Sequence, residues 1–304
     1  MPAKTPAKLR VTVLAGGPSA ERDISLASGQ AIAAGLDQRG HEVFISDIGP
    51  DDLAGLDHPA DVVFPALHGT FGEDGTLQRI MEERGITFVG SGSRASATAM
   101  DKVATKQLAE KLGVPTPPYE VVSPPAKPVL SPPVVVKPIA EGSSVATSIV
   151  HEASKLDEAI AAAARQSGGS ALVEQFVAGD ELTIGFLGSE ALPPIRIRPD
   201  REFYDFVAKY RDDHTEYLFD TGRSQSLLDQ AAELSRRVFE GLGCRHLGRV
   251  DWIADADDRL WFLEVNTIPG FTNHSLVPKA AEKIGIPFDE LVERLVYMAM
   301  EDRA

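Results

Sequence analysis

Short apolar runs alternate with helix-length amphipathic segments over the first hundred residues. The apolar runs predict strands at Leu9–Ala15, Val43–Asp47, Asp61–Leu67 and Ile86–Val89. The amphipathic segments predict a helix that Ser19 caps and that runs through Leu36, and another near Asp74–Arg84. This alternation indicates an open parallel sheet with helices on its faces and ligands at the carboxyl ends of its strands. No G-x-G-x-x-G follows the first strand, which disfavours dinucleotide binding.

The pattern changes beyond a predicted helix at Ser93–Leu112. A proline-rich stretch, Pro115–Pro133, looks like a crossing between units. The next segment predicts a smaller α+β domain. Its expected elements are a strand from Val134 through V-V-V-K-P, a helix at Ser154–Gln166, and strands at Val145–Val150, Ala171–Val177, Glu181–Leu187 and Ile195–Arg198.

The last third combines an irregular segment with a second α/β pattern. Residues from about Asp200 to Gly222 are charged and aromatic with no clear period, so we expect a mobile loop there. A helix at Ser224–Leu242, two strands and two terminal helices complete the prediction.

The two strands near the C-terminus carry the strongest chemical signal. His246–Ala254 and Arg259–Asn266 can pair as a hairpin across the D-A-D-D turn. Since alternate strand residues point the same way, Asp251, Glu264 and Asn266 then share one face. Three oxygen side chains there suit a hard cation such as magnesium, and Arg249 on the same face suits movement of phosphoryl charge. A surface hairpin with ordinary acids is the alternative, which the apolar flanks disfavour.

Other candidate ligand residues have a structural alternative beside the functional one. Lys137 ends a strand and precedes E-G-S-S-V, a turn whose amides can fold over phosphates, and Lys102 is a second candidate cation. Either lysine can equally be a solvated surface residue. The strand Ala171–Val177 can frame a purine, with Glu181 accepting from ribose hydroxyls.

Several loop residues are open to the same two interpretations. Glu21 sits at the carboxyl end of the first strand, but an acid in a first helical turn is also favoured by the dipole. His68 lies in a glycine-rich loop after another strand. A lone histidine is often structural, but its place at a strand end also suits a functional residue. Lys209–Tyr210 are loop residues, and Gly270 and Ser275 lie just past the hairpin, within reach of anything bound there.

Composition and charge narrow the classes of partner. A net charge of −15 argues against nucleic acid, whose backbone needs clustered Lys and Arg. The single cysteine, Cys244, excludes an internal disulfide and a cysteine metal cluster. No apolar run approaches the length of a membrane span, so we expect no membrane partner and a cytoplasmic location.

Seven segments, in this order, resemble the D-alanine–D-alanine ligases of the ATP-grasp superfamily. They are A-G-G-P-S-A-E-R-D-I-S-L, A-L-H-G-T-F-G-E-D-G-T-L-Q, G-S-G-S-R-A-S-A-T-A-M-D-K, V-V-K-P-I-A-E-G-S-S-V, F-Y-D-F-V-A-K-Y, G-R-V-D-W and L-E-V-N-T-I-P-G-F-T-N-H-S-L-V-P. The resemblance spans nearly the whole chain.

The resemblance implies a mixed α/β and α+β fold in three parts. An N-terminal open parallel α/β domain (1–100) that binds substrate would precede a two-lobed ATP-grasp fold that grips ATP. Its central lobe would span 101–187 and its catalytic lobe 188–304, with a mobile loop near 200–222. Homodimers are common in the family and are expected here.

The resemblance also assigns roles around ATP. Lys102 and Lys137 match phosphate-binding lysines, and Lys209 matches a loop lysine near the γ-phosphate. Glu174 and Glu181 match adenine and ribose contacts. The ligands of two magnesium ions, for which manganese can substitute, match Asp251, Glu264 and Asn266.

The remaining roles concern the amino acid substrates. Glu21 matches the residue that holds the amino group of the first D-alanine, and Ser143 and Tyr210 match residues that fix that acid and close the loop. Arg249 and the Gly270 amide match the oxyanion stabilisers. Positions lining the two D-alanine subsites match His68, Ser275 and Leu276.

The implied activity is ATP-dependent joining of two D-alanines through an acyl phosphate, for peptidoglycan precursor synthesis. Tyr210 favours D-alanine as second substrate, because phenylalanine is typical there in relatives that accept D-lactate. Gln175 departs from the lysine of many members and should alter affinity more than activity. One alternative is a ligase for D-lactate or D-serine. Another is a catalytically silent nucleotide-binding protein, but no magnesium ligand or phosphate lysine is missing.

Overall fold

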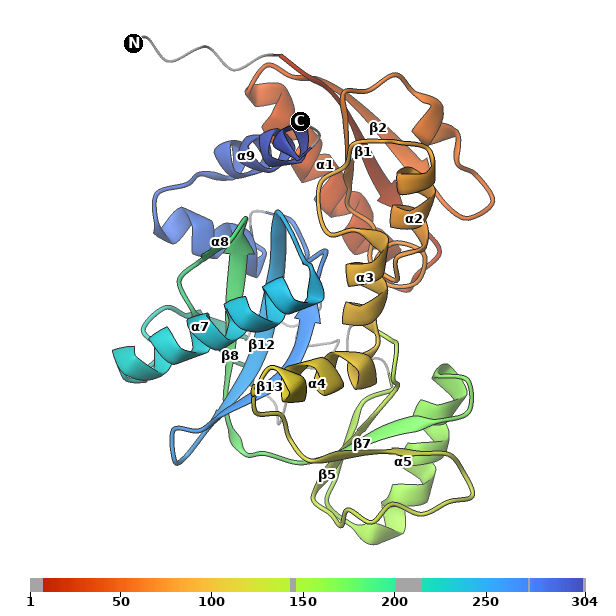
Figure 1. Cartoon of the computed structure of the whole chain (residues 1–304), viewed down its shortest axis with the longest axis vertical. Coiled ribbons are helices and arrows are strands. Elements are labelled where there is room, and N and C mark those ends of the chain that lie inside the picture. Colours follow the sequence, from red (N-terminus) through yellow and green to blue (C-terminus); the bar gives the residue numbers. More distant parts are fainter. Residues whose placement is uncertain (1–7, 143–145, 201–214, 273, 303–304) are drawn as a thin grey trace.

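The computed structural model describes residues 8–142, 146–200, 215–272 and 274–302. Within these residues the strands form three sheets, of three, six and four strands. The sheets follow one another along the long axis of the molecule, with the N-terminal sheet at one end and the six-stranded sheet in the middle (Figure 1).

The N-terminal sheet is parallel, as the sequence predicts. Its order is β2 (Glu42–Ile48), β1 (Arg10–Gly16), β3 (Val62–Pro65). Around it lie α1 (Arg22–Gln38), the 3-10 helix η1 (Ala54–Asp57) and α2 (Thr76–Glu83). The C-terminal helix α9 (Phe288–Glu301) returns to this unit and packs beside α1, burying Leu291 and Val292 in the same core as Val11 and Ile32 (Figure 1).

Three predictions for this region are wrong in detail. The strand expected at Ile86–Val89 is only an isolated parallel bridge between Val63 and Phe88. The first helix begins at Arg22, because the Ser19 hydroxyl accepts a hydrogen bond from the Glu21 amide in the turn before it. The single helix at 93–112 is two helices, α3 (Ser93–Met100) and α4 (Lys102–Lys111).

Asp101 causes the break between α3 and α4. Its backbone is extended, with φ −82° and ψ 101°, and its carboxylate accepts from the amides of Val103 and Ala104 at 2.9 Å each. Aspartate is a favoured N-cap because it satisfies the first free amides of a helix. The break therefore starts a new helix at Lys102, whose Nζ reaches the Glu141 carbonyl.

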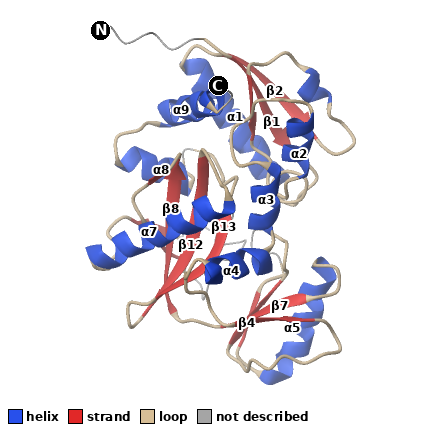
Figure 2. Ribbon diagram, viewed as in Figure 1, coloured by secondary structure: helices blue, strands red, loops and turns tan. Residues whose placement is uncertain are grey.

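The four-stranded sheet is antiparallel and forms the far end of the molecule. Its order is β4 (Tyr119–Val122), β7 (Ala171–Gln175), β5 (Val134–Lys137), β6 (Ser148–Val150). Helix α5 (Ala153–Gln166) covers one face (Figure 2). Val134, Val136 and Val173 meet Ile160 of that helix in a separate core.

The six-stranded sheet connects the other two units. Its main path is β11 (Glu216–Leu218), β10 (Ile195–Arg198), β8 (Gly179–Leu187), β12 (Leu247–Asp255), β13 (Leu260–Asn266), and β9 (Glu190–Ala191) pairs with β8. Helix α7 (Gln225–Leu242) covers the face that carries Ile184 and Trp252. Helix α8 (Leu276–Lys283) packs on the opposite face, where Val277 contacts the core that contains Leu187.

The sheet pairing corrects two expectations. The strands expected at Glu181–Leu187 and Ile195–Arg198 pair with β12 and with each other, and not with the smaller α+β sheet. A strand's own alternation cannot reveal which sheet it joins. Glu216–Leu218 forms a strand inside the segment expected to be a mobile loop, while 201–214 lie outside the described residues.

None of the helices in the described ranges combines the length and the apolar character required to cross a membrane.

Candidate active site

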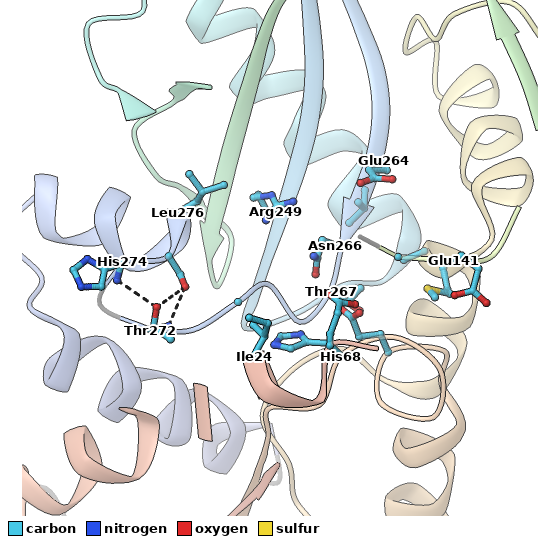
Figure 3. A pocket seen from close by; sticks show the side chains of 18 of the residues that line it. Ile24, His68, Glu141, Arg249, Glu264, Asn266, Thr267, Thr272, His274 and Leu276 are labelled. Carbon is cyan, nitrogen blue, oxygen red and sulfur yellow. Dashed lines mark hydrogen bonds between the residues drawn. The ribbon is translucent and has the colours of Figure 1, made fainter. Parts of the chain in front are cut away.

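A cavity of about 580 Å³ opens where the N-terminal unit meets the six-stranded sheet. Its walls come from the start of α1, the glycine-rich loop, the start of α4, the β12–β13 hairpin and the segment after β13 (Figure 3). Nine of the residues singled out in the sequence line it: Glu21, His68, Lys102, Arg249, Glu264, Asn266, Gly270, Ser275 and Leu276. Residues from five separate stretches of the sequence therefore face one space.

The hairpin pairs as the sequence predicts. Arg249 lies opposite Asn266, and Asp251 lies opposite Glu264. Directly opposed residues in an antiparallel pair project from the same face, so these four side chains share the face turned away from α7. The register shifts only between Asp251 and Trp252, so it leaves the pairing of these four residues intact.

Asp251 is held from two sides beneath the cavity. Arg249 donates from Nε at 2.9 Å and from a terminal nitrogen at 2.8 Å, a two-pronged contact with the carboxylate. The hydroxyl of Thr183 on β8 donates to the same carboxylate at 2.6 Å. The pair fixes the plane of the Arg249 guanidinium at the cavity wall, because such forked contacts specify geometry as well as charge.

The three oxygen-bearing side chains suit a hard cation by donor type and position. Asp251, Glu264 and Asn266 project from one face of adjacent strands, and the latter two line the cavity. Carboxylate and amide oxygens are ligands that Mg²⁺ accepts. Over the described ranges, no group of three or more His, Cys, Asp or Glu residues stands ready to hold a metal.

Lys102 connects the hairpin to the loop after β5. Its Nζ donates to the Glu141 carbonyl at 2.6 Å and lies 3.7 Å from Glu264 Oε2. Burial raises the pKa of the Glu141 carboxyl, and the charge of Lys102 opposes that rise. The neighbouring Gly142 reaches the start of α1, where an added Cβ would lie 3.4 Å from Glu21 Oε2. The four-stranded unit therefore closes over the Glu21 end of the cavity.

An acidic cluster that includes one residue missed in the sequence lies at that end. Glu73, in the same glycine-rich loop as His68, lines the cavity, and its Oε2 accepts from the Gly69 amide at 2.7 Å. Burial, with the nearby charge of Glu21, raises the pKa of Glu73 to about 8. Its position in H-G-T-F-G-E-D-G, five residues after His68, was the signal that could have found it.

His68 is fixed by one ring nitrogen only. Its Nδ1 lies 3.0 Å from the Ile268 carbonyl, so Nδ1 carries the proton and donates. The buried Nε2 has no hydrogen-bond partner among the described residues. Burial lowers the pKa of His68, against the opposing charge of Glu21.

Local hydrogen bonds hold the segment after β13 beside the hairpin. The Ile268 amide donates to Asn266 Oδ1 at 3.0 Å. Ser275 Oγ accepts from the Thr272 amide at 3.0 Å and lies 3.0 Å from Thr272 Oγ1 (Figure 3). Leu276 begins α8 directly after Ser275. The turn thus presents Gly270, Ser275 and Leu276 along one wall.

The residues expected around adenine and ribose lie outside the described cavity lining. Glu174 on β7 is buried, and its two oxygens lie 2.7 Å from Lys106 Nζ and 2.7 Å from Lys137 Nζ. Lys106 was missed in the sequence, although it follows Lys102 by one helical turn in M-D-K-V-A-T-K. Glu181 on β8 lies opposite Ile253 on β12, so it projects from the same sheet face as Asp251. Ser143, Lys209 and Tyr210 lie outside the described residues.

Comparisons with known proteins place the chain in a family. The family model described as D-ala D-ala ligase C-terminus matches residues 108–297, and the one described as D-ala D-ala ligase N-terminus matches residues 50–91. The chain belongs to the D-alanine–D-alanine ligase family. The family, the class of enzyme and the ATP-grasp type of fold expected from the sequence are confirmed.

Individual relatives of this ligase family match over nearly their whole length. A D-alanine–D-alanine ligase of Chromohalobacter salexigens is 45% identical over 295 residues, 94% of this chain and 93% of that protein. One of Syntrophotalea carbinolica is 44% identical over 291 residues, 94% of this chain and 95% of that protein.

Solved structures of the ligase family agree with the fold. A Bacillus anthracis ligase complexed with ATP has a TM-score of 0.83 at 27% identity, covering 97% of this chain and 98% of that one. The Coxiella burnetii ligase has a TM-score of 0.84 at 26% identity, covering 98% and 95%.

Proposed function

We propose that this chain joins two D-alanine molecules into D-alanyl-D-alanine, with an acyl phosphate formed from ATP as the intermediate. The observation that carries the proposal is one cavity in which an acidic end, a carboxylate-bearing hairpin and the Gly270–Ser275 turn face each other. The similarity to D-alanine–D-alanine ligases supports D-alanine as the substrate.

The acidic end suits the ammonium group of the first D-alanine. Glu21 is only 7% exposed, and an anion so close to a bound cation is little screened by water. Glu73, whose pKa is raised to about 8, is protonated at neutral pH and adds no competing charge. One carboxylate therefore fixes the substrate amine and leaves its carboxylate directed toward the hairpin.

The hairpin suits the phosphoryl transfer. Asp251, Glu264 and Asn266 would hold two magnesium ions, which when bound offset charge on the transferring oxygens. Lys102 supplies a further positive charge 3.7 Å from Glu264. Lys102 would face the phosphoryl oxygens, and the carboxylate oxygen of the first D-alanine attacks the γ-phosphorus as ADP leaves.

The second step needs donors for a developing oxyanion. The neutral amine of the second D-alanine attacks the acyl carbon, phosphate leaves with the electron pair of the broken C–O bond, and the leaving phosphate takes the proton that the amine loses. Arg249, held in one orientation by Asp251, and the Gly270 amide would donate to that oxyanion, and both residues line the cavity. Loss of one such donor typically costs about a hundred- to a thousandfold in rate.

Phosphate release from ATP and magnesium tests the proposal. We expect release that requires D-alanine, gives a dipeptide, and is not supported by L-alanine or, at neutral pH, by D-lactate as second substrate. Release that needs another acceptor would overturn D-alanine as the second substrate but would still support phosphoryl transfer from ATP. Magnesium-dependent ATP binding without release from any of these substrates would contradict ligase activity.

The setting follows from the substrates. We propose that the reaction takes place in the cytoplasm, where ATP is available, and that its product enters peptidoglycan precursor synthesis. We also propose a homodimer. Sedimentation at several protein concentrations checks the assembly, and a single monomeric species at all of them would contradict it.

A further inference from the structure

Lys106 on α4 is a fully buried lysine that lines no part of the cavity. Its Nζ lies 2.7 Å from Glu174 Oε1 and donates to Thr116 Oγ1 at 2.6 Å. Buried lysines are rare because removing an ammonium from water is costly. Packing alone does not explain why a buried ammonium lies close to a second lysine.

We propose that Lys106 is a positioning residue that sets the place of Lys137, and through it the binding of nucleotide phosphates. This inference rests on the proposed function, because it takes a nucleoside triphosphate as the ligand. Lys106 itself need not touch the nucleotide.

The first argument is the shared carboxylate. In the β5–β7 register Val135 lies opposite Glu174 and Lys137 opposite Leu172, so Lys137 and Glu174 project from the same sheet face. The Glu174 oxygen not facing Lys106 lies 2.7 Å from Lys137 Nζ. Because Lys106 fixes one oxygen, the carboxylate cannot rotate without losing a contact, and Lys137 is held at the other.

The second argument is charge. Lys106, Lys137 and Glu174 together carry one excess positive charge, with side chains at most 10% exposed. The further anion that acts on Lys106 is the partly exposed Glu264. Burial lowers the pKa of Lys106 to about 8, and Glu174 opposes that effect, so the ammonium form still prevails at neutral pH. A phosphate group near Lys137 would neutralise this excess, which is poorly screened at such depth.

The third argument is the link between the two lobes. The Thr116 hydroxyl that accepts from Lys106 donates to the Phe262 carbonyl at 3.0 Å. Phe262 lies on β13, two residues before Glu264. The chain Lys137–Glu174–Lys106–Thr116 therefore ties the strand of the phosphate lysine to the strand of the expected magnesium ligand.

Four variants test the proposal. Lys106→Met removes the charge at similar length, and Lys106→Arg retains it. Thr116→Val removes only the hydroxyl link and keeps the side-chain shape, which covers the case in which Lys106→Met does not fold. Lys111→Met is the matched control, an exposed lysine on the same helix.

The measurement compares two ligands by calorimetry: the non-hydrolysable ATP analogue AMP-PNP with magnesium, and adenosine, which has no phosphates. We expect Lys106→Met to raise the Kd for AMP-PNP by about tenfold, corresponding to about 1.4 kcal/mol of binding free energy. The Kd for adenosine should rise by less than about twofold. Thr116→Val should give a smaller loss of the same selectivity, Lys106→Arg should recover part of the affinity, and Lys111→Met should match the wild type.

Two results would overturn the proposal. One is wild-type AMP-PNP affinity in a folded Lys106→Met protein or, if that protein does not fold, in Thr116→Val. The other is an equal loss of AMP-PNP and adenosine affinity, which would mean general loosening of the lobe. Since binding is measured without D-alanine, failure of the ligase reaction leaves this test unaffected.

Discussion

Glu174 and Glu264 are two carboxylates that the fold uses in opposite ways. Glu174 is 2% exposed at the side chain, and each oxygen lies 2.7 Å from a lysine nitrogen. Glu264 is 32% exposed, lines the cavity, and lies 3.7 Å from Lys102 Nζ. Glu174 thus fixes structure between two buried lysines, while Glu264 faces a cavity that a ligand can enter.

Two histidines show the same contrast. His246 uses both ring nitrogens, because Nδ1 accepts from the Gly90 amide at 3.0 Å and Nε2 donates to Asp302 at 2.9 Å. His68 donates from Nδ1 to Ile268 and presents a buried Nε2 without a partner among the described residues. His246 thus holds two units together through both nitrogens, while His68 turns one nitrogen toward the cavity that it lines.

Glu174→Gln should have the largest effect on stability. It leaves Lys106 and Lys137 buried without a counter-charge, and breaking a buried ion pair from one side costs about 3–5 kcal/mol. Urea denaturation at pH 7 measures the loss. Without Glu174 to oppose burial, the folded-state pKa of Lys106 falls further below its unfolded value, so the variant pays for a buried ammonium at pH 7. The loss should shrink as pH rises through about 8, the folded-state pKa of Lys106 in the wild type, because the lysine is then neutral in the folded state of both proteins.

Glu158→Gln is the matched control for this change, an exposed glutamate on α5 in the same unit. It should alter the free energy of unfolding by less than about 0.5 kcal/mol. Equal stability of the two variants would show that the Glu174 cluster contributes nothing to the fold.

Glu264→Gln should leave stability nearly unchanged and reduce turnover on the order of a hundredfold, or about 2.7 kcal/mol of transition-state stabilisation. The carboxylate is partly exposed and points into the cavity, so its loss removes charge from the proposed phosphoryl site and not from a core. Magnesium-dependent phosphate release gives kcat, and thermal unfolding checks the fold. Glu190→Gln, on exposed β9, should keep full activity; near-wild-type turnover of Glu264→Gln at low magnesium would refute the metal assignment.

The hairpin with Glu264 was predictable because it depends on local signals. A period of two and a polar turn fix both the strands and the shared face of Asp251, Glu264 and Asn266. The contacts of Glu174 were not predictable in this way. They depend on where α4 lies against β7, and no spacing within one segment reports the distance between Lys106 and a strand about 70 residues later.

The fold shows the same division. The alternation that identifies β8 as a strand is equally compatible with the four-stranded and the six-stranded sheet, because both offer an apolar face. Asp101, by contrast, was a local signal, since its capping role interrupts an otherwise helical run. The roles assigned to individual site residues, and the domain limits, stay predictions.

His246→Asn tests the saturated histidine through pH. Burial lowers the folded-state pKa of His246, helped by the charge of Arg245 and opposed by the bond to Asp302. The unfolded chain therefore binds the proton first, so this contribution is complete above about pH 6.5 and is lost as pH falls through the folded pKa. Asparagine tolerates the positive φ of 62° at this position.

We expect the variant to lose about 1 kcal/mol at pH 8 through its missing hydrogen bonds. Its stability should also fall less than that of the wild type between pH 7 and pH 5. Urea denaturation at both pH values gives the difference in slope. Identical slopes would mean that protonation of His246 does not weaken its contacts with Gly90 and Asp302.

Gln175→Lys should have the smallest effect, because it changes a side chain beside the Glu174 cluster without entering it. Gln175 Nε2 donates to the Pro133 carbonyl at 2.8 Å, at an exposed position, and its backbone amide donates to Pro118. The strand pairing that shapes the expected adenine pocket is therefore independent of the side chain. We expect the KM for ATP to change by less than about threefold, worth about 0.6 kcal/mol, with kcat unchanged in steady-state kinetics. A fall in kcat would mean that a third lysine disturbs the ion pair between Glu174 and Lys137. Position 175 would then belong to the cluster formed by Lys106, Glu174 and Lys137.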